Sequence, residues 1–210
     1  GLPMKKIKIC GLTRKEEIEA VNLCLPDYAG FVFAPGRHQI SPSRAKELKS
    51  ILSPSIPAVG VFVNSPVSQI CSLADNGVLD LIQLHGNENE DYTRTLKKLL
   101  PNIPVIRAFR ILSETSEETF SKAFSYPSDY LLFDTFTKNQ YGGSGLAFDW
   151  SLIPPCPRPY FLAGGIGISN VEQAAALPAF CLDISSSVET RGKKDFRKIQ
   201  QIIEKVRSVS

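Results

Sequence analysis

The stretch Lys6-Ile7-Lys8-Ile9-Cys10-Gly11-Leu12-Thr13-Arg14 joins an expected strand to the start of an expected helix. Its two isoleucines indicate the strand, and its glycine permits a tight reversal. Thr13, with Glu16 three residues later, fits the capping box that opens a helix. Cys10 therefore lies at the carboxyl end of the strand, where proteins with parallel sheets carry many functional residues.

The same alternation of strand and helix recurs along the whole chain. Its short apolar runs are nearly continuous rather than strictly alternating, which is typical of strands buried on both faces of a parallel sheet. Helices must then cover that sheet. The eight runs are Ile7 to Cys10, Tyr28 to Phe33, Ala58 to Val63, Leu81 to His85, Val105 to Arg110, Tyr130 to Asp134, Tyr160 to Ala163 and Cys181 to Ser185.

Start and stop signals support helices between these runs. Ser41-Pro42 and Ser65-Pro66 each predict a cap followed by proline in the first helical turn. Ser169 with Glu172 predicts another capping box, and Asn76-Gly77 predicts a helix end.

Eight such units in 210 residues, about 26 residues each, predict an α/β fold: a single-domain (β/α)₈ TIM barrel over residues 4–210. Gly1-Leu2-Pro3 before Met4 resembles the remnant of a cleaved tag. In the sixth unit, a polar and glycine-rich stretch from Phe136 to Phe148 predicts a long loop followed by a stub helix. An open doubly wound sheet shares the alternation, but polar residues end nearly every strand and converge on one mouth only if the sheet closes.

Composition narrows the function classes. Hydrophobic residues make up 43% and charged residues 21% of the chain, and the net charge is only +3, with basic residues spread along it. A nucleic-acid surface is therefore not indicated. No uncharged apolar run approaches the roughly 20 residues that span a bilayer, so we expect no membrane association and a cytoplasmic location. Five cysteines without a Cys-x-x-Cys spacing predict neither disulfides nor zinc.

Three glycine- or serine-rich loops follow the last three strands. Loops after the seventh and eighth strands of such barrels commonly bind phosphate, because glycines let backbone N–H groups approach the oxygens and a helix start adds a favourable dipole. Each pair of glycines alone could mark only a tight turn. The candidate phosphate-binding residues are Gly143, Gly164, Gly165, Ser185 and Ser186.

Two strand ends carry candidate catalytic groups. Asp134 ends an apolar run, where partial desolvation is expected to raise the pKa of its carboxyl and suit it to donate a proton. Cys10 could act as a base if its thiol is ionised, and Lys8 or the following helix start could assist. The alternatives are a helix cap at Asp134 and a small packing residue at Cys10.

Three further polar side chains are candidates for substrate binding. Arg37 lies on a loop where its guanidinium could pair with a carboxylate or a phosphate, although surface arginines are common. His85 ends a strand and could orient substrate or serve a structural role. Asp183 is a carboxylate within a buried strand, which is costly unless paired or functional, so we expect it to point inward. Two histidines without clustered ligands do not predict a metal site.

Together these residues resemble one family, phosphoribosylanthranilate isomerase, over nearly the whole chain from Met4. The resemblance rests on six segments: Lys8-Ile9-Cys10-Gly11-Leu12-Thr13-Arg14, Val59-Gly60-Val61-Phe62-Val63, Gln83-Leu84-His85-Gly86, Gly142-Gly143-Ser144-Gly145 with Phe148-Asp149-Trp150, Leu162-Ala163-Gly164-Gly165, and Asp183-Ile184-Ser185-Ser186 with Val188-Glu189.

The resemblance implies an Amadori rearrangement in tryptophan biosynthesis, without metal or organic cofactor. N-(5-phosphoribosyl)anthranilate becomes 1-(2-carboxyphenylamino)-1-deoxyribulose 5-phosphate, and the chain is a monomer or a homodimer. Cys10 matches the family's general base and Asp134 its general acid. Arg37 matches the arginine that holds the anthranilate end, and Asp183 a carboxylate near the substrate hydroxyls.

The arginine segment, Ala34-Pro35-Gly36-Arg37-His38-Gln39, departs from the Ser-Pro-Arg of many relatives. Ser187 also replaces a frequent glycine, and the connection from Val188 to Lys194 is short. Two alternatives stay open. Another phosphosugar barrel enzyme such as indole-glycerol-phosphate synthase relies on lysine and glutamate, and a convincing pair is lacking here. A non-catalytic phosphate-binding barrel would not need Cys10 and Asp134.

Overall fold

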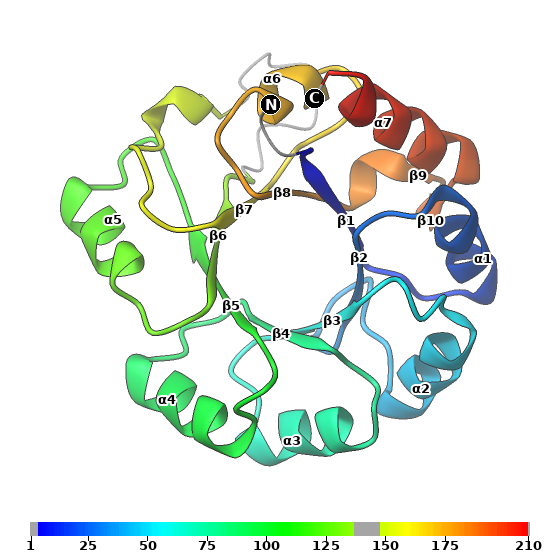
Figure 1. Ribbon diagram of the computed structural model, residues 1–210, viewed down its shortest axis with the longest axis horizontal. Coiled ribbons are helices and arrows are strands. Elements are labelled where there is room, and N and C mark those ends of the chain that lie inside the picture. The colour runs from blue at the N-terminus through cyan, green and yellow to red at the C-terminus, as the bar shows by residue number, and fades with distance from the viewer. Residues whose placement is uncertain (1–3, 137–147, 210) are drawn as a thin grey trace.

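The computed structural model describes residues 4–136 and 148–209. The suggested tag remnant at residues 1–3 and the candidate phosphate ligand Gly143 lie outside these residues. Within them, eight parallel strands pair in chain order, and the first pairs with the last to close a barrel (Figure 1). The strands are β1 (Lys6–Cys10), β2 (Tyr28–Val32), β3 (Ala58–Phe62), β4 (Leu81–Leu84), β5 (Val105–Arg110), β6 (Tyr130–Asp134), β7 (Tyr160–Ala163) and β8 (Cys181–Ile184).

Helices surround the barrel and cover its outer face (Figure 1). They are α1 (Lys15–Cys24), α2 (Pro42–Ile51), α3 (Val67–Asp75), α4 (Glu90–Leu99), α5 (Glu117–Phe124), the 3₁₀ helix η2 (Trp150–Leu152), α6 (Val171–Ala175), the 3₁₀ helix η3 (Ser186–Val188) and α7 (Phe196–Ser208). A small hairpin, β9 (Glu189–Thr190) with β10 (Lys193–Lys194), precedes α7. The closed (β/α)₈ barrel is thus confirmed, and the sixth unit has the expected stub helix in η2. None of the described helices is long and apolar enough to cross a bilayer.

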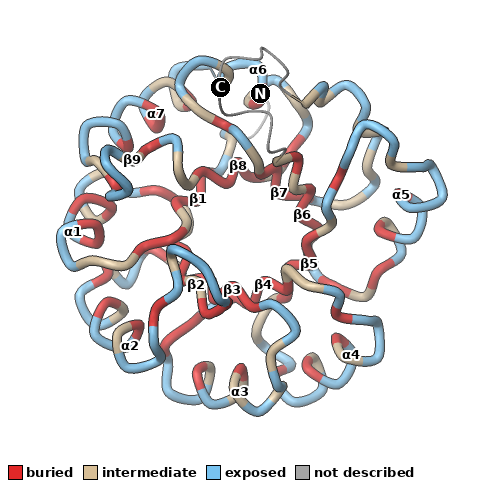
Figure 2. Tube along the Cα trace, turned by 180° about the vertical axis from the view of Figure 1, so that it is seen from behind, coloured by how far each residue is buried: buried red, intermediate tan, exposed pale blue. Residues whose placement is uncertain are grey.

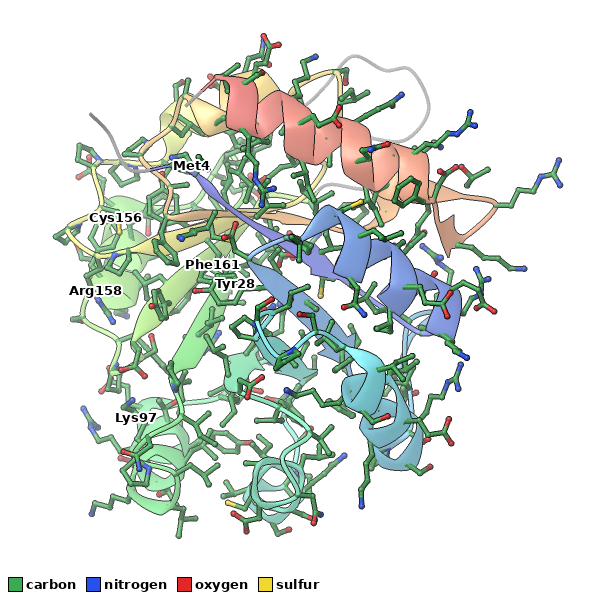
Figure 3. The ribbon with its side chains drawn as sticks, turned by 45° about the vertical axis from the view of Figure 1, so that its right-hand side comes forward. Met4, Tyr28, Lys97, Cys156, Arg158 and Phe161 are labelled. Atoms are coloured by element: carbon green, nitrogen blue, oxygen red, sulfur yellow. The ribbon has the colours of Figure 1, made fainter. Side chains whose placement is uncertain are left out.

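The buried hydrophobic residues form two clusters, and the strands of the barrel are buried nearly throughout (Figure 2). Ile7 and Ile9 of β1 belong to the larger core between the strands and the helices. Lys8 and Cys10 alternate with them along the strand and face the barrel interior, because successive strand side chains point to opposite faces. The amino-terminal end of the barrel is filled by aromatic rings, with Tyr28 and Phe161 at a centroid distance of 5.5 Å (Figure 3). The opposite, carboxyl end is the one that holds the open cavity.

Two helix boundaries agree with the sequence. Ser41 caps α2 by accepting a hydrogen bond from the backbone N–H of Arg44, with Pro42 in the first turn. Asn76 ends α3, followed by Gly77 at a φ of +70°.

The other three helix starts were wrongly predicted. The carboxylate that closes the start of α1 belongs to Glu17, which accepts from the backbone N–H groups of Thr13 and Arg14, and not to Glu16. The helix begins one residue later than the pattern suggests, so the position three beyond its cap is Glu17. Similarly, Pro66 and not Ser65 precedes α3, and Asn170 rather than Ser169 precedes α6, in both cases without a side-chain cap.

Candidate active site

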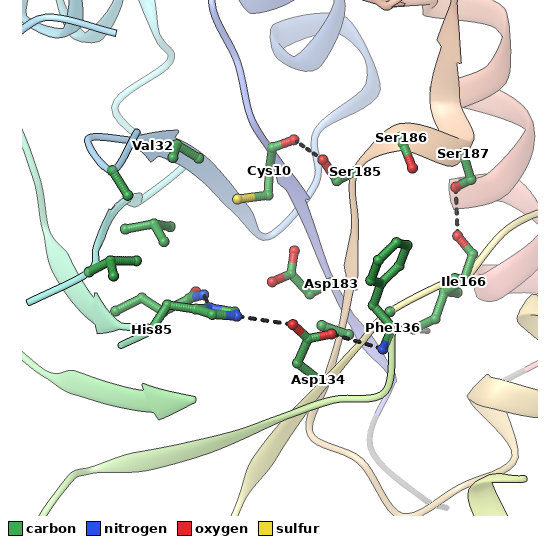
Figure 4. Close-up of a pocket in the computed structure, with 17 residues that line it drawn as sticks. Cys10, Val32, His85, Asp134, Phe136, Ile166, Asp183, Ser185, Ser186 and Ser187 are labelled. Atoms are coloured by element: carbon green, nitrogen blue, oxygen red, sulfur yellow. Dashed lines mark hydrogen bonds and ion pairs between the residues drawn. The ribbon is translucent and has the colours of Figure 1, made fainter. Parts of the chain in front are cut away.

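A cavity of about 340 Å³ opens at the carboxyl ends of the strands (Figure 4). It brings together eight of the predicted site residues, which come from strands that are far apart in the sequence: Cys10, His85, Asp134, Gly164, Gly165, Asp183, Ser185 and Ser186. Val32, Ala34, Val61 and Val63 form an apolar wall on the side of β2 and β3. The cavity therefore has one apolar side and one side rich in glycine and serine.

Cys10 and Asp134 both face this cavity, with Asp183 between them in the view of Figure 4. Cys10 is the last residue of β1 and Asp134 the last residue of β6, which places both at the same end of the barrel. The backbone carbonyl of Cys10 accepts a hydrogen bond of 3.0 Å from the Ser185 hydroxyl. The sequence prediction that these two groups share one site is in agreement with this geometry.

The thiol of Cys10 has a pKa raised above the ordinary value of 9.0. Burial is the main cause, since a thiolate loses its hydration there. Lys8 and Lys194 lower the pKa and Asp183 raises it, but burial dominates. Lys8 thus assists the thiolate as predicted without fully offsetting burial.

The carboxyl of Asp134 has a lowered pKa, so the predicted rise is wrong for this structure. Burial does raise it, as expected. The larger combined effect comes from His85, whose Nε2 lies 3.1 Å from Oδ2, from the backbone N–H of Phe136, which donates to Oδ1 at 3.0 Å, and from the charge of Arg110. These contacts stabilise the carboxylate more than burial destabilises it.

Asp183 points into the barrel, as predicted. Its Oδ2 accepts from the Lys8 ammonium at 2.9 Å, and the Lys8 side chain is fully buried. Its Oδ1 is buried without a hydrogen-bond partner, the single such side-chain atom among the described nitrogens and oxygens. A buried carboxylate oxygen without a donor is costly, so this atom is suited to accept a hydrogen bond from a ligand hydroxyl.

The glycine and serine loops line the cavity opposite the apolar wall. Gly164 has a φ of +103°, and a Cβ there would lie 2.3 Å from the backbone nitrogen of Phe136. Only glycine lets the loop after β7 approach the end of β6 this closely. The helix α6 begins at Val171, some way beyond these glycines, and η3 begins at Ser186 on the cavity. The expected helix start therefore lies after β8, in a 3₁₀ turn, rather than after β7.

Arg37 lies on the loop after β2 and does not line the cavity. Its guanidinium donates to Glu189 Oε1 at 2.8 Å and to the carbonyl of Gly192 at 3.2 Å, and the side chain is 54% exposed. Glu189 Oε2 also accepts hydrogen bonds from His38 Nε2 at 2.8 Å and from Lys194 Nζ at 2.6 Å. Burial alone would raise the pKa of Glu189, but the hydrogen bonds from Lys194 and Arg37 outweigh it and hold the pKa at about 2.

Two contributors to the site were missed by the sequence reasoning. Gly30 on β2 lies beside Cys10 in the sheet and leaves room for its thiol. Lys194 has a fully buried side chain that donates to the backbone carbonyl of Ser185 and to Glu189. The signal for Gly30 was available, since a glycine inside a strand often marks a close approach. The position of Lys194 depends on a hairpin that the sequence does not reveal.

A closed (β/α)₈ barrel whose mouth holds an acid and a thiol over one cavity defines an acid–base enzyme. Residues 7–205 match the family described as N-(5'phosphoribosyl)anthranilate (PRA) isomerase. The chain therefore belongs to the N-(5'-phosphoribosyl)anthranilate isomerase family.

Individual relatives agree over the full length. The chain is 42% identical over 207 residues to the N-(5'-phosphoribosyl)anthranilate isomerase of Endomicrobium trichonymphae, covering 98% of this chain and 100% of the relative. It superposes on the phosphoribosyl anthranilate isomerase of Thermotoga maritima with a TM-score of 0.85 at 36% identity, over 98% of this chain and 100% of the other. A further similar structure is an isomerase in complex with reduced 1-(o-carboxyphenylamino)-1-deoxyribulose 5-phosphate, with a TM-score of 0.82, 34% identity and the same coverage.

Proposed function

We propose that this protein converts N-(5-phosphoribosyl)anthranilate to 1-(2-carboxyphenylamino)-1-deoxyribulose 5-phosphate in tryptophan biosynthesis. The observation that carries the proposal is the placement of Cys10 and Asp134 over one cavity whose walls are apolar on one side and rich in glycine and serine on the other. The reaction moves protons within one molecule, so an acid and a base in the same cavity are the groups that it needs.

Asp134 donates its proton to the ring oxygen of the ribose, and the bond between this oxygen and C1′ breaks to give a Schiff base. The Cys10 thiolate then removes the proton from C2′, which gives an enolamine. Tautomerisation of the enolamine yields the ketose. The acid ends as a carboxylate and the base as a thiol, and these are the protonation states that the pKa values of the two groups favour in the free protein.

Asp134 must be protonated to act as the acid, and substrate binding raises the pKa of its carboxyl. A phosphorylated ligand brings negative charge to the site and displaces water, and both effects raise the pKa of a carboxyl. Transfer of one proton through solvent, from the Cys10 thiol to the Asp134 carboxylate, then gives the reactive pair of thiolate and carboxylic acid.

Each end of the substrate has a matching wall. The anthranilate ring fits the apolar side formed by Val32, Ala34, Val61 and Val63. The phosphate fits the opposite side, with Gly164, Gly165, Ser185 and Ser186. Gly143 lies outside the described residues, and the sequence pattern alone assigns it to the same phosphate site. Asp183 accepts a hydrogen bond from a sugar hydroxyl through its unpartnered Oδ1.

Arg37 is the residue that binds the anthranilate carboxylate in this proposal. Three of its five N–H donors remain besides the two that bind Glu189 and Gly192. The side chain is more than half exposed and lies on the loop that continues the apolar wall from Ala34. The ion pair with Glu189 holds this guanidinium in place, three residues beyond the cavity-lining Ala34.

The test is a fluorescence assay that follows the loss of phosphoribosylanthranilate. Turnover by the wild-type protein, lost in Asp134→Asn, is the expected result. Binding without turnover would favour a phosphate-binding barrel, and turnover of the ketose to an indole would favour indole-glycerol-phosphate synthase.

We also propose that the enzyme works in the cytoplasm as a monomer or homodimer. All five cysteines are free, which suits a reducing compartment and keeps Cys10 available as a base. Light scattering coupled to gel filtration distinguishes the two oligomeric states.

A further inference from the structure

A chain of hydrogen bonds crosses the floor of the cavity from β1 to β6. The Lys8 ammonium donates to Gln83 Oε1, Gln83 Nε2 lies 2.8 Å from His85 Nδ1, and His85 Nε2 lies 3.1 Å from Asp134 Oδ2. Gln83 and His85 are two residues apart on β4 and its extension, so both side chains face the interior. The chain ends on the carboxyl that the proposed mechanism uses as its acid (Figure 4).

The direction of every bond in this chain follows from its first member. An ammonium group can only donate, so the oxygen of the Gln83 amide must face Lys8. The NH₂ group of Gln83 then faces His85, and because it can only donate, His85 Nδ1 must accept. In the neutral ring the proton is consequently on Nε2, from which it is donated to Asp134.

Burial makes this order rigid. Lys8 is fully buried and Gln83 is 2% exposed, so water cannot replace either partner. The Asp183 carboxylate, 2.9 Å from the Lys8 ammonium, keeps this lysine charged, and the pKa of Lys8 is raised although burial acts against it. A lysine that stays charged cannot accept a hydrogen bond, which excludes the flipped orientation of the Gln83 amide.

We propose that Gln83 is a positioning residue that holds His85 in the Nε2-protonated neutral form and thereby fixes the Asp134 carboxyl for proton transfer. The inference rests on the proposed role of Asp134 as the acid. Gln83 need not touch the substrate, since its oxygen is bound to Lys8 and its nitrogen to His85.

Other charged groups surround the His85 ring, and they also affect any measurement made on this histidine. Arg107 and Arg110 on β5 and Asp134 on β6 border the same hollow as His85, and Glu88 follows β4. Beyond Gln83 lie Lys8 on β1 and Asp183 on β8. Among the described residues, the hydrogen bond at His85 Nδ1 comes from Gln83 and that at Nε2 joins Asp134, so the Gln83 amide sets the proton at Nδ1.

The chain has only two histidines, His38 and His85, so ¹⁵N-histidine labelling gives a spectrum that can be assigned with the single variant His38→Gln. In the wild-type protein at neutral pH we expect His85 to show a protonated Nε2 and an unprotonated Nδ1. A protonated Nδ1, or signals averaged between the two tautomers, would overturn the proposal whether or not the protein is an isomerase.

Two variants of Gln83 then reverse or remove the hydrogen bond that fixes the tautomer of His85. Gln83→Glu keeps an oxygen for Lys8 but presents an acceptor to His85, so the ring should carry its proton on Nδ1. Gln83→Met removes both hydrogen bonds, and the tautomer signals should average. If Gln83 acts through His85 on Asp134, kcat should fall about 10- to 100-fold in Gln83→Glu while KM stays within about twofold.

Other patterns contradict the proposal in distinct ways. A rise in KM with unchanged kcat would mean that Gln83 binds substrate directly. A lower melting temperature with an unchanged tautomer and unchanged kcat would mean a purely structural role. Absence of isomerisation by the wild-type protein would contradict the proposed function but leave the tautomer result standing.

Discussion

Gly30 on β2 lies directly beside Cys10 on β1, and a Cβ added at Gly30 would lie 2.5 Å from the Cys10 sulfur. It would also lie 3.1 Å from both Cα and Cβ of Cys10, so rotation of the thiol alone does not relieve the contact. The glycine thus fixes where the base can sit, although it has no side chain of its own.

Gly30→Ala is expected to displace the Cys10 thiol and to reduce kcat by roughly 10- to 100-fold, since a misplacement of about 1 Å has effects of this size. Steady-state kinetics together with the melting temperature check this. Cys10→Ala in the same background should recover part of the lost melting temperature, because it removes the sulfur. Wild-type kcat in Gly30→Ala would show that the strand accommodates the methyl group.

Asp134→Asn is expected to abolish turnover, with a loss of at least about 100-fold, because an amide cannot deliver the proton to the ring oxygen. Cys10→Ser should also be severely impaired, since a serine hydroxyl is a much weaker acid than a thiol. Protection by inorganic phosphate in thermal unfolding should persist in Asp134→Asn. Near wild-type activity of either variant would contradict the assignment of acid and base.

The pH profile of kcat/KM follows from the two pKa shifts. The reactive form needs Asp134 protonated and Cys10 ionised, and its fraction is constant between a lowered pKa of Asp134 and a raised pKa of Cys10. The profile should therefore be flat around neutrality and fall only above pH 9.0 on the alkaline side. The substrate phosphate titrates near pH 6, at about the usual value, so the alkaline limb is the diagnostic one.

Alkylation provides an independent measure of the same thiol. The rate at which iodoacetamide modifies Cys10, followed by peptide mass spectrometry, should rise through the same pKa as the loss of activity. An alkaline limb centred well below pH 9.0 would mean that Lys8 and Lys194 outweigh burial.

Arg37→Ala is expected to raise KM for phosphoribosylanthranilate more than it weakens binding of inorganic phosphate. The Arg37 side chain is 54% exposed and Lys194 still pairs with the Glu189 carboxylate, so the loss of stability should stay within about 1 kcal/mol. Inhibition constants for inorganic phosphate in both proteins provide the comparison. Equal weakening of both ligands would assign Arg37 to the phosphate site.

Glu189→Gln should lower the free energy of unfolding by about 3 kcal/mol at pH 7, because it leaves the buried Lys194 ammonium without its carboxylate. The folded-state pKa of Glu189 is depressed to about 2 from 4.5, so its contribution is present above pH 4.5 and is lost as the pH falls toward 2. Urea unfolding at pH 7 and pH 3 should show a difference between variant and wild type that shrinks at the lower pH. A constant difference would show that the charge of Glu189 is not its cause.

The strands and the residues at their carboxyl ends were predictable because strands buried on both faces give continuous apolar runs, and polar residues end or follow nearly every run. Cys10 and Asp134 could be paired for that reason. The lowered pKa of Asp134 could not be predicted, because it depends on His85, 49 residues away in the chain. The partnership of Gln83 with Lys8 similarly joins residues 75 apart and requires the closed barrel.

Glu189 joins the loop after β2 to the hairpin after β8, and its partner Arg37 is 152 residues away in the chain. Contacts of such long range form only after most of the chain is ordered, because other contacts must first offset the entropy that is lost in closing so large a loop. The Glu189 cluster should therefore contribute little to the rate of folding and should mainly slow unfolding. The lifetime of the folded barrel is in this way linked to the same loop that carries Arg37.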